Sequence, residues 1–127
     1  MPNSKYYAVM GMANISTANS NLDGTGAVSS VITSGSDSTI IKKITVKATQ
    51  TTTLGMVRIF IERNSMFWLL DEINVSATIQ SSSQSAFEYV VFSGITLNNG
   101  DAIYAATQNA ESFNVIVEGT KIVACPC

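Results

Sequence analysis

Two alternating runs that meet at the polar pair Asn64-Ser65 constrain the fold of this chain more than any other feature. Successive side chains of a strand point to opposite faces, and both runs follow this period of two. A short polar break between such runs is typical of the tight turn of a β-hairpin. We therefore predict an antiparallel hairpin over residues 57–75. Its core face is expected to be formed by Val57, Ile59, Ile61, Phe67, Leu69, Ile73 and Val75.

The opposite face of this hairpin carries Phe60, Trp68 and Leu70, with Arg58 and Glu62 beside them. Such an apolar set is too large to be left in water on a lone domain. We therefore expect a partner chain to cover it. A register error of one residue would exchange the two faces, because the side chains alternate.

Six further stretches show strand patterns between loops rich in Gly, Ser, Asn and Asp. No pattern of period 3.6 continues for three turns, and both prolines lie outside the strands. About eight strands with unequal loops predict an all-β fold, a single-domain antiparallel β-sandwich of jelly-roll type. The six stretches are residues 5–15, 27–33, 39–48, 86–92, 102–107 and 113–123.

We expect one domain over residues 1–127. Residues 1–16 are either an N-terminal arm or the first strand, and residues 124–127 are a tail. In that tail, Cys125 and Cys127 are either unpaired in a reducing compartment or joined between subunits, by a disulfide or in a thiolate cluster.

The composition argues against catalysis and metal binding. The chain has no histidine, which removes Ser-His-Asp and Cys-His sites and the usual zinc sites. We predict no enzyme activity, no cofactor and no metal, although Asp23, Asp37 and Asp101 lie in loops of a kind that can bind calcium. The net charge of −2 excludes a positive field for nucleic acid. No targeting signal or apolar stretch of membrane-spanning length is present, so we expect a soluble protein with no membrane partner.

Four segments carry a family resemblance: LLDEINVSATIQ (69–80), AFEYVVF (86–92), LNNGDAIYAATQNAESFNV (97–115) and VEG (117–119). Together they resemble a family of small β-sandwich virion proteins of tailed bacteriophages. The most distinctive part is the segment Thr-x-Asn-Ala-Glu-x-Phe-Asn-Val at residues 107–115. The Leu97-x-x-Gly100-Asp101 element is less specific, since it is also similar to trimeric jelly rolls of the tumour-necrosis-factor and C1q type. The resemblance covers residues 54–119, about half of the chain.

The resemblance implies a structural role in the virion and no reaction. We expect an auxiliary or decoration protein of the capsid, made in the host cytoplasm. Its partners would be other copies of itself, with a trimer favoured, and virion proteins such as the major capsid protein. Alternatives are a head–tail connector, a tail or fibre component, or a receptor- or carbohydrate-binding module. The candidate interface residues are Phe60, Trp68, Leu70 and Tyr104, with Tyr6 and Tyr7 as anchors to the shell.

Overall fold

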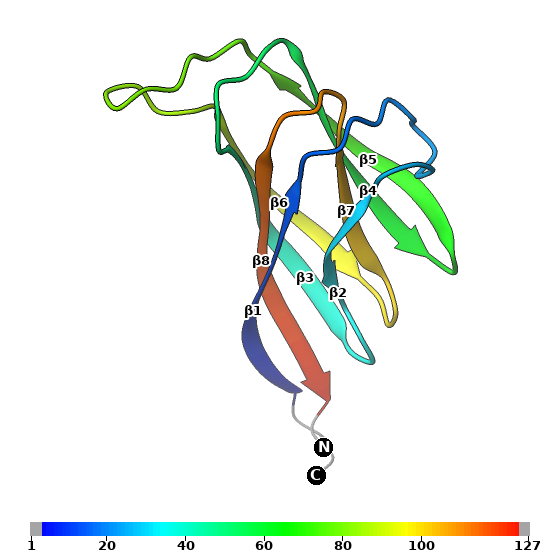
Figure 1. Cartoon of the computed structure of the whole chain (residues 1–127). Coiled ribbons are helices and arrows are strands. Elements are labelled where there is room, and N and C mark those ends of the chain that lie inside the picture. Colours follow the sequence, from blue (N-terminus) through cyan, green and yellow to red (C-terminus); the bar gives the residue numbers. More distant parts are fainter. Residues whose placement is uncertain (1–3, 125–127) are drawn as a thin grey trace.

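The computed structural model describes residues 4–124, which form two packed four-stranded antiparallel sheets (Figure 1). One sheet has the strand order β1-β8-β3-β6, and the other has the order β2-β7-β4-β5. This arrangement is an all-β jelly-roll sandwich and confirms the predicted fold class. The strands are β1 (Ser4–Ile15), β2 (Ser29–Thr33), β3 (Ser38–Ala48), β4 (Gly55–Arg63), β5 (Met66–Val75), β6 (Glu88–Leu97), β7 (Ala102–Thr107) and β8 (Phe113–Ala124).

Local sequence chemistry explains the turn between β4 and β5. Asn64 and Ser65 have φ values of 53° and 64°, and two successive positive φ values give a two-residue turn whose twist matches the strands. The predicted hairpin is therefore confirmed. The segment predicted as either an arm or a first strand is strand β1, which pairs with β8 along its whole length. Cys125 and Cys127 lie outside the described residues.

The core lies between the two sheets, and its buried side chains are aliphatic apart from Phe113, with Phe87 packed against them. Strand β3 follows the predicted alternation, because Ile44, Val46 and Ala48 are buried while Lys43 and Lys47 are on the outer face. On that outer face Lys43 pairs with Glu118 on β8 and Lys47 pairs with Glu88 on β6.

The predicted faces of β5 need correction, because this strand has a bulge at Leu70. Ile59 of β4 pairs with Asp71, but the next residue, Phe60, pairs with Leu69, so Leu70 has no partner on β4. An extra residue shifts the alternation by one position. Beyond the bulge Trp68 is therefore opposite Ile61, on the core-facing side of the sheet. The expectation that Trp68 shares a face with Phe60 is wrong.

Candidate functional site

Phe60 lies in an aromatic cluster on the outer face of the β2-β7-β4-β5 sheet. It pairs across the strands with Tyr104 of β7. The ring of Phe67 stands edge-on to both, with centroids 6.4 Å from Phe60 and 5.0 Å from Tyr104. Edge-to-face packing at these distances is favourable. Phe60 is fully buried, whereas Phe67 and Tyr104 are partly exposed.

A loop of the same chain, residues 19–27, lies against Phe67 of this cluster. Gly24 in that loop is buried, has a φ of +84°, and sits so close that an added Cβ would come within 2.3 Å of Phe67. Asn19 is buried and holds the loop in place: its Nδ2 donates to the carbonyl oxygens of Thr25 and Ala27, at 2.9 and 3.0 Å. Phe60 itself is fully buried within the single chain, which corrects the expectation that a partner chain covers it.

Trp68 and Leu70 are exposed at the free edge of β5, with Trp68 at 57 % and Leu70 at 37 %. Trp68, Ile61 and Arg63 line a shallow hollow of about 200 Å³. We call the exposed apolar residues of this strand the β5 rim; they are Met66, Trp68, Leu69 and Leu70. The structure brings Phe60 and Tyr104 together but separates both of them from Trp68. Whether a partner covers the β5 rim stays a prediction.

Tyr6 and Tyr7 lie on opposite faces of β1 and are 68 % and 49 % exposed. Met10 and Met12 lie on the same face as Tyr6 and are also exposed. Sequence reasoning missed these two methionines, although their even spacing from Tyr6, by four and six residues, was a visible signal. The outer face of β1 therefore presents more apolar surface than Tyr6 alone.

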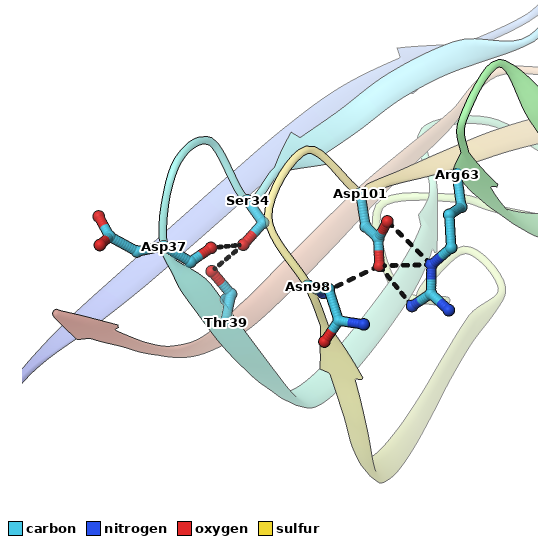
Figure 2. Close-up of polar contacts among 6 residues, drawn as sticks. All are labelled: Ser34, Asp37, Thr39, Arg63, Asn98 and Asp101. Carbon is cyan, nitrogen blue, oxygen red and sulfur yellow. Dashed lines mark hydrogen bonds and ion pairs between the residues drawn. The ribbon is translucent and has the colours of Figure 1, made fainter. Parts of the chain in front are cut away.

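Polar contacts at the end of the sandwich near the β4–β5 turn join three segments of the chain (Figure 2). Arg63, the last residue of β4, binds the carboxylate of buried Asp101 with Nε 3.0 Å from each oxygen. The backbone N–H of Asn98 also donates to Asp101, at 2.8 Å. The hydrogen bonds from Arg63 hold the pKa of Asp101 below its usual value, although burial acts in the opposite direction. Nearby, the Ser34 hydroxyl lies 3.0 Å from that of Thr39.

The Thr107–Val115 segment, which is the most distinctive part of the family resemblance, holds the β3–β4 loop. Asn109 Nδ2 donates to the carbonyl oxygen of Leu54 at 2.9 Å. The carboxylate of Glu111 accepts hydrogen bonds from both the backbone N–H and the hydroxyl of Thr53, at 3.0 and 2.7 Å. These contacts give the polar residues of the segment a structural role, and Phe113 anchors it in the core.

The acidic loop residues are engaged by their own chain. Asp101 binds Arg63, the carboxylate of Asp37 lies 3.5 Å from Lys121 Nζ, and Asp23 accepts from the Thr25 hydroxyl at 2.6 Å. Within residues 4–124, no three or more His, Cys, Asp or Glu side chains gather as metal ligands would. The same residues contain no helix of the length and apolar character needed to cross a membrane.

No family model and no curated protein matches the sequence. The fold is similar to a chain in the acidic stable capsid structure of Helicobacter pylori bacteriophage KHP30, with a TM-score of 0.56, 8 % identity and coverage of 100 % of both chains. A chain of infectious bursal disease virus strain Gx gives a TM-score of 0.41 at 10 % identity, over 96 % of this chain and 37 % of that one. The core of Drosophila NLP gives 0.37 at 8 % identity, over 94 % and 97 %. At these identities the likeness to the KHP30 chain defines the class of fold, a jelly roll.

Proposed function

We propose that this chain is a structural virion protein of a tailed phage, an auxiliary or decoration protein that acts through protein–protein contacts on the capsid. The observation that carries the proposal is the end-to-end fold similarity to a chain of a phage capsid structure, which covers all of both chains. The motif resemblance of residues 54–119 to small virion proteins supports the same role from the sequence. A virion location follows from this role.

The exposed apolar residues support an adhesive mechanism. The β5 rim and the outer face of β1 lie on edge strands of different sheets, so one copy can contact more than one neighbour. We propose that the β5 rim joins copies into an oligomer, with a trimer favoured, and that Tyr6 and Tyr7 contact the major capsid protein. Large aromatic residues at such positions commonly dominate interface energies.

The distribution of exposed aromatic residues favours this role over glycan binding. The exposed aromatic residues are Tyr6, Tyr7, Trp68, Tyr89 and Phe92, and all five lie on strands. The large apolar residues exposed on the loops are aliphatic: Leu22, Leu54 and Ile79. A sugar-binding loop would need an aromatic face or a cluster of polar groups in a pocket.

Co-sedimentation with capsids tests the proposal. Particles would be assembled from the major capsid protein of the phage that encodes this chain, without the chain itself, and then mixed with the purified protein. We expect saturable binding, with a fixed number of copies for each capsid protein subunit. Absence of binding, together with absence of the chain from purified virions by mass spectrometry, would overturn the proposal. Binding to a glycan array but not to capsids would favour the receptor-binding alternative.

A further inference from the structure

Four strands have one free edge each: β1 and β6 in one sheet, and β2 and β5 in the other. A free edge presents unpaired N–H and C=O groups to any other extended chain. Natural proteins therefore blunt free edges with bulges, charges, prolines or short strands. The four edges of this protein can be compared for these devices.

Three of the four edges are blunted. Strand β2 is five residues long and has a bulge at Val31. Strand β5 has the bulge at Leu70, followed by the charged pair Asp71-Glu72. Strand β6 has an extra residue within Ser93-Gly94, opposite the bulged segment of β3. Each bulge interrupts the regular row of backbone groups that a new strand would need.

Strand β1 has only one of these features, a single charge at its start. Its twelve residues pair with β8 in an unbroken register from Ser4 to Ile15, without a bulge or a proline. Its one charged residue is Lys5, near the start. The side chains next to this free edge are apolar and exposed on the outer face, with Tyr6, Met10 and Met12 each more than half exposed. An edge that is long, regular and apolar is suited to pairing with another strand.

We propose that β1 pairs antiparallel with β1 of a second copy of this chain, which joins the two four-stranded sheets into one continuous sheet. The proposal rests on the oligomeric role proposed above and adds a second contact between copies to that of the β5 rim. Charge favours this orientation, because an antiparallel pair places the two Lys5 side chains at opposite ends. A parallel pair would place them side by side, where like charges repel.

The two-fold symmetry of the contact determines which residues of the two β1 strands can pair. A two-fold axis perpendicular to the sheet keeps both outer faces on one side, and directly paired residues of an antiparallel sheet share a face. One residue of β1 must therefore pair with its own copy at the centre. The exposed tyrosine and methionines of one copy then lie beside those of the other. Such a contact closes with two copies, so a trimer would use a different surface such as the β5 rim.

A charge at the edge tests the contact. Ala8 and Thr96 are both exposed and lie in one cross-strand row, Ala8-Thr120-Ile40-Thr96, at the two opposite edges of the same sheet. We expect Ala8→Lys to halve the mass of the two-fold species in light scattering, because the two introduced charges lie close to the axis. Thr96→Lys is the matched control and should leave the mass unchanged. Circular dichroism of both variants checks that the fold is retained.

A cysteine scan gives an independent readout that does not depend on the stability of Ala8→Lys. Single cysteines are placed at each residue from Tyr6 to Met10, with the two terminal cysteines replaced by serine. Antiparallel pairing should give a strong disulfide-linked dimer at one position, the residue on the axis, because only there do the two copies of a residue face each other. Parallel pairing would cross-link at every position on one face. Cross-linking at all positions or at none overturns the proposal.

The capsid assay separates this contact from the proposed function. If wild-type protein is monomeric and gives no cross-link but still binds capsids, the β1 contact is wrong and the virion role stands. If wild-type protein shows the single cross-link but neither binds capsids nor occurs in virions, the contact stands and the virion role is wrong.

Discussion

The guanidinium group of Arg63 contacts both carboxylate oxygens of Asp101, with Nε 3.0 Å from each and Nη2 2.5 Å from Oδ2. The pair links the end of β4 to the residue that precedes β7 (Figure 2). Asp101 is buried, and its backbone carbonyl also accepts a hydrogen bond from Ser34 N–H at 2.8 Å. One residue therefore joins three segments of the chain at this end of the sandwich, two through its carboxylate and one through its backbone.

We expect Asp101→Asn to lower the free energy of unfolding by about 2 kcal/mol at neutral pH. The change removes the charged acceptor used by Arg63 and by the backbone N–H of Asn98, and hydrogen bonds to charged groups contribute about this much. Urea unfolding followed by circular dichroism measures the difference. An unchanged midpoint and slope would show that the pair contributes nothing to stability.

The same carboxylate predicts an acid-dependent loss of stability. Arg63 lowers the pKa of Asp101 in the folded state below its ordinary value of 3.8, so the unfolded chain takes up the proton first as the pH falls. The stabilisation is therefore fully present above about pH 5 and is lost as the pH falls through the folded-state pKa. Between these limits wild-type stability should fall more steeply with acidification than that of Asp101→Asn. Parallel curves in urea titrations from pH 7 to pH 2 would contradict this.

Gly119 of β8 permits the close approach of β3. A Cβ at this position would come within 2.3 Å of the carbonyl oxygen of Ile40, which is backbone and cannot move aside alone. We expect Gly119→Ala to destabilise the protein by about 1–3 kcal/mol, as overpacking commonly does. Gly94→Ala is the control, because a Cβ there meets nothing within 4 Å. Thermal unfolding should separate the two variants, and equal midpoints would show that the strands have room to separate.

Asn19 is expected to control the loop that lies over Phe67. Its side chain makes three hydrogen bonds inside the loop, and Asn19→Ala removes all of them from a buried position. We expect faster hydrogen exchange and faster proteolysis within residues 19–27. Asn21→Ala is the control, since Asn21 is exposed and bonds only Thr25 through its side chain. Equal exchange in the two variants would show that Asn19 does not hold the loop.

Local chemistry made much of the fold predictable. The Asn64-Ser65 turn requires residues that tolerate a positive φ, and the alternation of β3 separates Ile44 and Val46 from the lysines on either side of them. Both signals are contained in a few neighbouring residues. The eight strands and the jelly-roll class follow from such signals, repeated along the chain.

Non-local contacts explain what the sequence did not reveal. The run Met66–Leu70 is apolar at every position, so it fits either register, and only pairing with β4 places Trp68 on the core-facing side. The aromatic cluster around Phe60 also meets a polar loop far away in the chain, in which Gly24 lies against Phe67. No residue pattern near Phe67 indicates that this loop returns to it.

Trp68 and Phe60, which the sequence placed on one face, are expected to respond differently to truncation. Trp68 is more than half exposed, so Trp68→Ala should change the free energy of unfolding by less than about 1 kcal/mol. Phe60 is fully buried, so Phe60→Ala should cost about 3–5 kcal/mol. Urea unfolding of the two variants at equal protein concentration measures both changes.

For assembly into oligomers we expect the reverse order, with the larger effect from Trp68→Ala. If the β5 rim joins copies of the chain, Trp68→Ala lowers the oligomer mass in light scattering while its circular dichroism remains that of the wild type. Leu54→Ala is a suitable control, because Leu54 is an exposed apolar residue that lies outside the β5 rim. If Trp68→Ala unfolds and the wild type is a monomer, Trp68 belongs to the core of a single chain. In that case the β5 rim is not a contact between copies.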